Sequence, residues 1–263
     1  MYRLIVGFLL LGYFVFPVVL KAELPFDELA LYMSFSQLDG DKVIDESGNK
    51  NHGTIEKAKL AKGKGKYGDA MQFKGGDNHV LIKSSKTLSI PDEVTISVWV
   101  NWNDAPGDGW LAVLANGKQG GPWENYGLFV NRGSRYFYFT TSLGGEGEHK
   151  VRNSGNNTTQ SGKWTHCVCT YDGKTAKIYV DGELKKEDAQ GLKLVGGNVD
   201  LRLGHREGSG LWYNGLIDEV AIFSVALNKK QVQEASGELA VLMAVQPEGK
   251  LATVWGRVKF GNR

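Results

Sequence analysis

The stretch that decides the fold runs from residue 94 to residue 102 and reads Val-Thr-Ile-Ser-Val-Trp-Val-Asn-Trp. Val94, Ile96, Val98, Val100 and Trp102 recur at every second position, so in an extended chain they share one face. A helix would bring them to different sides. The alternation therefore predicts a strand whose apolar face lies in a core.

Short runs of the same character, rich in β-branched and aromatic residues, follow one another along the chain between clusters of Gly, Asn and Asp. They are Leu29–Phe35, Trp110–Leu114, Tyr126–Asn131, Arg135–Thr141, Trp164–Tyr171, Lys174–Val180, Val199–Leu203 and Leu216–Phe223. Asp172-Gly173 and Asp181-Gly182 join consecutive runs as hairpin turns. A helix is expected only late, over residues 228–235. We therefore predict an all-β fold, a sandwich of two antiparallel sheets.

The composition indicates one globular domain with a real core. The chain has 263 residues, of which 41% are hydrophobic and 23% charged, and a formal net charge of +2. A charge so close to zero gives no reason to expect nucleic acid as a partner. Cys167 and Cys169 would share one face of a strand, a poor geometry for a disulfide, so they are expected to be small buried side chains.

The N-terminus has the pattern of an export signal. A basic start at Arg3 precedes an uncharged apolar run from Leu4 to Leu20, and Ala22 offers a small residue for cleavage. We expect a signal peptide over 1–22, a main domain over 23–237, and a C-terminal tail or closing hairpin over 238–263. The alternative is an uncleaved membrane anchor. Either way, the domain is expected to be secreted or extracytoplasmic, without membrane insertion after cleavage.

Motifs in a fixed order connect the chain to a family. The first half contains Phe35, the run 45–53, the run 65–73 and the run 96–100; the second contains the runs 164–168, 171–173, 178–182, 203–204 and 214–223. Together they resemble laminin-G-like, concanavalin A-like domains over about residues 29–236. The resemblance implies a jelly roll of two packed sheets, often with one structural calcium and often appended to secreted proteins.

An oxygen-rich loop is the candidate metal site. It contains Asp39, Asp41, Asp45, Asn49 and Asn51, and calcium prefers six to eight oxygen ligands. The resemblance implies that Asp218 completes the site, so the expected calcium ligands are Asp45, Asn49 and Asp218. The alternative is a turn whose Asx side chains bind their own backbone.

Aromatic residues in or beside the predicted loops are the candidate ligand site. An aromatic face next to polar groups suits a sugar ring or a peptide. The expected ligand-binding residues are Trp110, Trp123, Tyr126, Arg206, Trp212 and Tyr213. The alternative is that these rings close the ends of the sandwich, and Trp99 and Trp164 are assigned to the core.

Other surfaces are less specific. A lysine run at positions 57, 59, 62, 64 and 66 fits either a patch for sulfated glycans or, as we expect, a solvated loop.

Sequence signatures of catalysis are missing. The chain contains neither GxSxG nor HExxH. A glycoside hydrolase would need two carboxylates on one sheet face, and Asp218 and Glu219, being adjacent, are expected on opposite faces. We predict a secreted, non-catalytic module that binds a glycan, or alternatively an extracellular protein as an adhesion or scaffolding domain.

Overall fold

The structure, a computed structural model, describes residues 24–104, 109–118, 125–142, 149–189, 194 and 196–244. The expected signal peptide and residues 245–263 lie outside the described residues. Within the described ranges, no helix combines the length and the apolar character that crossing a membrane requires.

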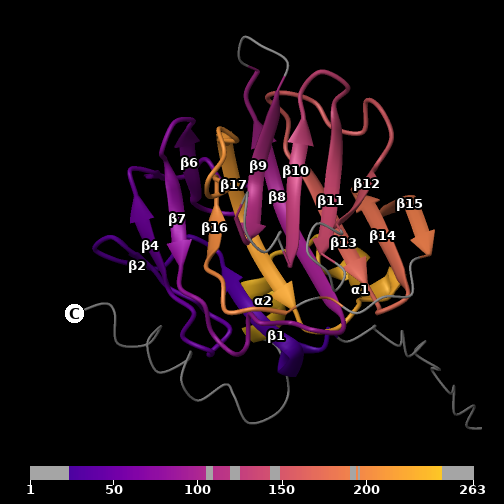
Figure 1. Cartoon of the computed structure of the whole chain (residues 1–263). Helices are drawn as coiled ribbons and strands as arrows, with labels where there is room; N and C mark the ends of the chain where they lie inside the picture. Colours follow the sequence, from indigo (N-terminus) through magenta and orange to yellow (C-terminus); the bar gives the residue numbers. More distant parts are fainter. Residues whose placement is uncertain are drawn as a thin grey trace, which may run out of the picture.

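Two antiparallel sheets lie face to face, as predicted (Figure 1). Sheet A has the order β15-β14-β13-β8-β17-β6-β5, with β1 also pairing with β17. Its strands are β1 (Leu29–Met33), β5 (Lys59–Ala61), β6 (Ala70–Lys74), β8 (Val94–Trp102), β13 (Thr165–Tyr171), β14 (Thr175–Val180), β15 (Glu183–Ala189) and β17 (Asn214–Phe223).

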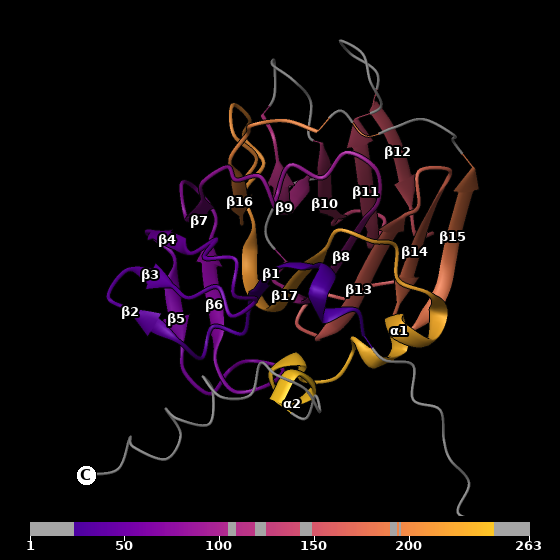
Figure 2. The same ribbon diagram turned by 90° about the horizontal axis from the view of Figure 1, so that it is seen from below.

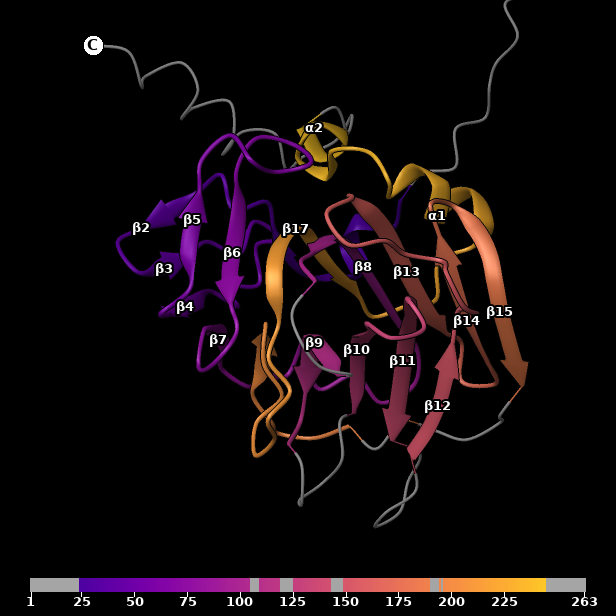
Figure 3. The ribbon, with the colours of Figure 1, turned by 90° about the horizontal axis from the view of Figure 1, so that it is seen from above.

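Sheet B has the order β12-β11-β10-β9-β16-β7-β4-β3-β2. Its strands are β2 (Leu38–Asp39), β3 (Lys42–Val43), β4 (Gly53–Glu56), β7 (His79–Ile82), β9 (Trp110–Asn116), β10 (Tyr126–Asn131), β11 (Tyr136–Ser142), β12 (His149–Asn153) and β16 (Leu201–Leu203). Seen from above, strands β8, β13 and β14 of sheet A and strands β9 to β12 of sheet B form separate layers (Figure 3).

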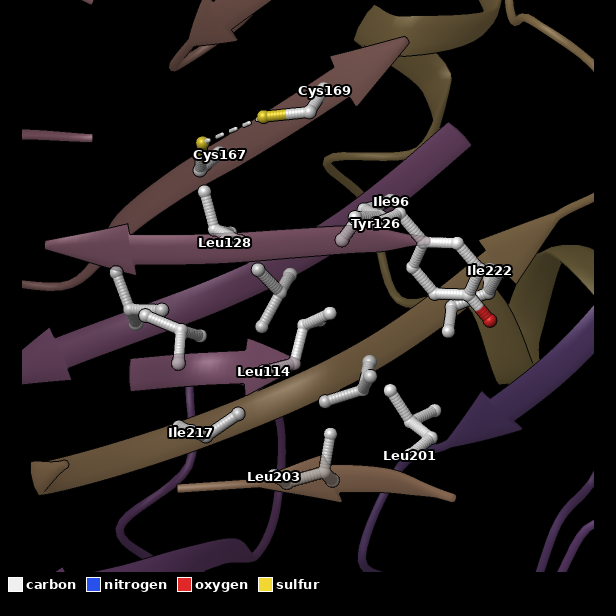
Figure 4. Packing of buried hydrophobic residues seen from close by; sticks show 14 of the residues in the cluster. Ile96, Leu114, Tyr126, Leu128, Cys167, Cys169, Leu201, Leu203, Ile217 and Ile222 are labelled. Carbon is white, nitrogen blue, oxygen red and sulfur yellow. Dashed lines mark hydrogen bonds between the residues drawn. The ribbon is translucent and has the colours of Figure 1, made fainter. Parts of the chain in front are cut away.

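The core lies between the sheets. Ile96 and Ile217 from sheet A pack with Leu114, Leu128 and Leu203 from sheet B (Figure 4), and all five are fully buried. Removing an aliphatic side chain of this size from water is worth roughly 1.5–3 kcal/mol. The apolar alternation of residues 94–102 is thus confirmed as the inward face of β8.

Turns and the first helix also follow their sequence signals. The carboxylate of Asp172 accepts the backbone N–H groups of Lys174 and Thr175, which fixes the turn between β13 and β14. Asn228 caps helix α1 (Lys229–Glu234) in a capping box with Gln231. The cysteines are free and buried, as expected.

The beginning of the expected tail forms a helix rather than a strand. Helix α2 (Leu239–Ala244) and α1 lie on the outer side of sheet A (Figure 2), as does the short η1 (Phe26–Glu28) before β1. Leu239 is fully buried there against a cluster that includes Tyr32 and Phe223. The helices cover part of the outer face of sheet A and none of the aromatic residues of sheet B described below.

Candidate functional site

An aromatic cluster stands on the outer face of sheet B. Strand register places Trp110 of β9, Asn131 of β10 and Tyr136 of β11 in one row across the strands. The next row holds Phe129 and Tyr138. The residues between them along each strand point into the core, so both rows face away from sheet A. We call Trp110, Phe129, Tyr136, Tyr138 and Arg206 the sheet B surface.

The rings of this surface contact one another edge to face. The ring centres of Trp110 and Tyr138 are 4.5 Å apart, those of Trp110 and Tyr136 5.8 Å, and those of Phe129 and Tyr138 5.9 Å. Trp110, Tyr136 and Tyr138 are half-buried, whereas Phe129 is buried beneath its neighbours. Each ring is held by a paired strand, so the exposed parts form a rigid platform.

The loop between β16 and β17 adds a cation to the platform. The guanidinium of Arg206 lies 6.0 Å from the ring centre of Phe129, a distance compatible with a cation–π contact. Leu211, from the same loop, packs against the cluster, and the N–H of Arg206 donates to the Leu211 carbonyl. Two of the residues predicted from the sequence, Trp110 and Arg206, are thus on the same surface.

Two predicted ligand residues belong to the core instead. Tyr126 and Tyr213 are fully buried, with hydroxyls that donate to the carbonyls of Leu88 and Leu216. Tyr126 begins β10 and Tyr213 directly precedes β17, so both lie beside a loop in the sequence, but their phase in the strand turns them inward. The expectation that these rings meet a ligand is therefore wrong.

Trp212 is half-buried and stacks on His205, with ring centres 3.6 Å apart and an interplanar angle of 9°. Burial lowers the pKa of His205 to about 4, so the imidazole is neutral at physiological pH. Its other ring neighbour is His79 of β7. Trp212 therefore makes its aromatic contacts with histidine rather than with the sheet B surface. Trp123 lies outside the described residues.

Sequence reasoning missed Phe129, Tyr136 and Tyr138. They stand within runs that the sequence predicts as strands, whereas the candidate ligand residues are those in or beside the predicted loops. The signal was present, because Tyr136, Phe137, Tyr138 and Phe139 are four consecutive aromatics. In a strand, such a run must place two rings on each face.

Side chains of the oxygen-rich loop form hydrogen bonds with backbone groups instead of lying free to coordinate a metal ion. The carboxylate of Asp45 accepts the N–H groups of Tyr32, Ser47 and Asn51 at 2.8–3.0 Å. The side-chain amide of Asn49 donates to the carbonyl of Leu29 at 2.7 Å. These contacts tie the loop to the edge of β1, which is the Asx-turn alternative.

Asp218 is engaged elsewhere. Its carboxylate accepts N–H groups from Tyr67, in the loop between β5 and β6, and from Glu219. The three expected calcium ligands therefore hold two different loops, and their contacts do not fit one metal cage. Among the described residues, no group of three or more His, Cys, Asp or Glu side chains has a metal-binding arrangement. These contacts favour the Asx-turn alternative over the calcium site that the family resemblance implies.

The adjacent acids Asp218 and Glu219 do not point to opposite faces, because β17 bulges between Asp218 and Ala221. Glu219 adopts a φ of +51° and binds Tyr32 and the start of α2 on the helix-covered side of sheet A. Burial raises the pKa of Asp218 to about 7 and that of Glu219 to about 8. Both side chains are inaccessible to a substrate.

The chain has the architecture of a β-sandwich binding domain: a jelly roll with aromatic residues on one outer face. Residues 74–233 match the family Laminin_G_3, described as the "Concanavalin A-like lectin/glucanases superfamily". Because this match covers more than half of the 263 residues, the chain belongs to that family, and the predicted membership is confirmed.

The relatives and solved structures that resemble this chain have low sequence identity to it. Adhesion G-protein coupled receptor V1 of Danio rerio is 25% identical over 183 residues, 65% of this chain but 3% of the receptor. The binding domain of Paraclostridial Mosquitocidal Protein 1 superimposes with a TM-score of 0.65 and 15% identity, over 80% of this chain and 52% of that one. This chain therefore spans only part of the length of either protein.

Domain 4 of AbnA, an extracellular GH43 arabinanase of Geobacillus stearothermophilus, was solved in complex with arabinotriose. It superimposes with a TM-score of 0.59 and 21% identity, over 80% of this chain and 98% of that domain. At these identities, the structural likenesses establish the shared fold.

Proposed function

We propose that this domain is a non-catalytic carbohydrate-binding module that holds a glycan on the sheet B surface. The observation that carries the proposal is the platform of half-exposed Trp110, Tyr136 and Tyr138, fixed on paired strands beside Arg206. The complex of the AbnA domain with arabinotriose supports a search among oligosaccharides, since that domain shares the fold.

The chemistry of the platform suits a sugar ring. The face of a pyranose or furanose is apolar and packs on an indole or phenol ring, while its hydroxyls need hydrogen-bonding groups at the rim. The hydroxyl of Tyr136 makes no hydrogen bond to any described residue, and the phenol is half-exposed. Arg206 adds hydrogen-bond donors beside Phe129.

The burial and the hydrogen bonds of two acidic residues support binding without catalysis. A retaining or inverting glycosidase needs two accessible carboxylates on either side of the scissile bond. The adjacent acids Asp218 and Glu219 are buried and accept backbone N–H groups. Action outside the cytoplasm is part of the proposal, supported by the expected signal peptide.

A protein partner is the alternative, and the adhesion receptor of Danio rerio, a relative over part of its length, makes it worth testing. A protein-binding surface would present a contiguous apolar patch of a few hundred Å². Among the described residues, the exposed large hydrophobic side chains are Leu184 on β15 and Val241 on α2. They are on different elements, which favours the glycan.

A glycan array tests the proposal, with arabinan oligosaccharides included and with calcium present or chelated. We expect the wild-type domain to bind a defined set of glycans, and Trp110→Ala to lose this binding while Leu184→Ala retains it. Equal binding by both variants would show that the sheet B surface is not the site. Absence of any glycan binding by the folded wild-type domain would overturn the proposed function.

A further inference from the structure

The outer face of sheet A carries a second row of outward side chains, away from the helices. Strand register places Lys59 of β5 opposite Gln72 of β6, Gln72 opposite Leu216 of β17, and Leu216 opposite Asn101 of β8. Trp164 directly precedes Thr165, which pairs with Val100, so Trp164 continues the row beyond Asn101. These strands lie side by side in Figure 2. We call these five residues the sheet A row.

The side chains of this row face solvent. Residues that flank Gln72 and Asn101 along their strands belong to the core, so the two amides point the other way. Trp164, Asn101, Leu216 and Gln72 are half-buried, and Lys59 is exposed. Trp164 was expected in the core, and that expectation is wrong: it lies on the same side of β13 as His166, outside the sandwich.

The amides of the row have unused hydrogen-bonding capacity. The side chains of Gln72 and Asn101 make no hydrogen bond to any described residue, although each carries two donor hydrogens and an acceptor oxygen. Between them stands Leu216, and beside Asn101 the indole of Trp164. Alternating amide and apolar groups match the alternating hydroxyls and ring faces of a sugar chain.

Positive charge borders the row. Lys66 lies in the loop that Asp218 fixes, and its ammonium is 4.2 Å from the ring centre of Trp99. Neither Lys59 nor Lys66 has a carboxylate at ion-pair distance among the described residues. Ammonium groups without a carboxylate partner favour an anionic ligand.

We propose that the sheet A row is a second ligand surface, distinct from the sheet B surface, and that it binds an acidic polysaccharide. Gln72 and Asn101 bind hydroxyls, the Trp164 ring packs on a sugar face, and Lys59 and Lys66 bind the acidic groups. Five strands at the usual ~4.8 Å spacing span about 19 Å, which suits several consecutive sugars rather than one ring. The two surfaces are on opposite sides of the sandwich.

Affinity gel electrophoresis tests this surface, because an acidic polymer in the gel retards a protein that binds it. With polygalacturonate as the probe, we expect retardation of the wild type and about tenfold weaker binding by the double variant Lys59→Gln and Lys66→Gln, from two exposed charge contacts. Lys230→Gln, an exposed lysine of α1, is the matched control and should bind like the wild type. Absence of wild-type retardation, or equal retardation of the double variant, would overturn the proposal.

A second set of measurements tests whether the sheet A row recognises the sugar and not only the negative charge of the polymer. Asn101→Ala and Trp164→Ala should each weaken retardation by polygalacturonate without reducing thermal stability enough to unfold the domain, and Asn101→Ala alone suffices if Trp164→Ala does not fold. Polyglutamate, a polyanion without sugars, should retard the protein less than polygalacturonate does; equal retardation would contradict a glycan site.

A further arm separates the two surfaces. Trp110→Ala should be retarded by polygalacturonate like the wild type. Its loss of retardation, with Lys59 and Lys66 intact, would assign the polymer to the sheet B surface and overturn a second site.

Discussion

The carboxylate of Glu219 accepts hydrogen bonds from the hydroxyl of Tyr32 at 2.8 and 2.9 Å and from the backbone N–H of Leu239 at 2.9 Å. The same Tyr32 hydroxyl accepts the N–H of Ala240. One buried acid thus links β17, β1 and the start of α2. The bulge turns Glu219 to the side on which Asp218 already lies by its alternation with Ile217.

Because Asp218 and Glu219 are buried, we predict that the free energy of unfolding falls as the pH rises. Burial raises the pKa of Glu219 to about 8 and that of Asp218 to about 7, whereas both acids ionise near pH 4 in the unfolded chain. Between these values the folded state binds more protons, so the free energy of unfolding decreases with pH. Urea titrations from about pH 5 to about pH 7 should show this slope, and Glu219→Gln should make it shallower. A slope of the opposite sign in the wild type would contradict the assignment.

Asp45 is predicted to be structural. Asp45→Ala leaves three backbone N–H groups of Tyr32, Ser47 and Asn51 without their acceptor, and we expect a loss of about 3 kcal/mol in the free energy of unfolding. Lys50→Ala, in the same loop but exposed, should cost far less than this. Denaturation of both variants in urea checks the difference, and equal stabilities would contradict the role of Asp45.

Calcium provides a separate check on the same loop. Because Asp45 and Asn49 are engaged with backbone groups, we expect the melting temperature of the domain to be the same with calcium and with a chelator. A ligand that binds only the folded state would raise it. A calcium-dependent rise that Asp45→Ala abolishes would restore the calcium cage implied by the family resemblance.

The cap of α1 is the fourth prediction. The side chain of Asn228 accepts the N–H groups of Lys230 and Gln231, and Asn228→Ala should reduce the free energy of unfolding by about 1 kcal/mol. Asn228→Ser, which retains an N-cap acceptor, should recover most of that loss. Thermal melts of the two variants compare them directly; indistinguishable melting temperatures would argue against the cap.

Local patterns were sufficient for much of the fold. The alternation from Val94 to Trp102 delimits β8 with its inward face correct, and the signals at Asp172 and Asn228 produced the turn and the cap that they predict. These features depend on neighbours in sequence. Their physics, side-chain parity in a strand and hydrogen bonds over two or three residues, is visible without the rest of the chain.

The site was less predictable because it depends on partners distant in sequence. The bulge before Ala221 arises from the pairing of β17 with β8, and it reverses the expected direction of Glu219. The outward direction of Trp164 follows from the register of β13 with β8. Similarly, the run Tyr126–Asn131 predicts where β10 begins, but no local pattern shows that its first residue, Tyr126, points inward.

The central claim is that a glycan binds on the outer face of sheet B, and an NMR titration tests it most directly. Arabinotriose is added to the ¹⁵N-labelled domain while the indole N–H resonances are followed. We predict that the signal of Trp110 shifts with added sugar, whereas that of Trp102, buried in the core and bonded to Thr159, does not. If the strongest glycan from the array as well as arabinotriose leaves Trp110 and its neighbours unshifted, the account is contradicted.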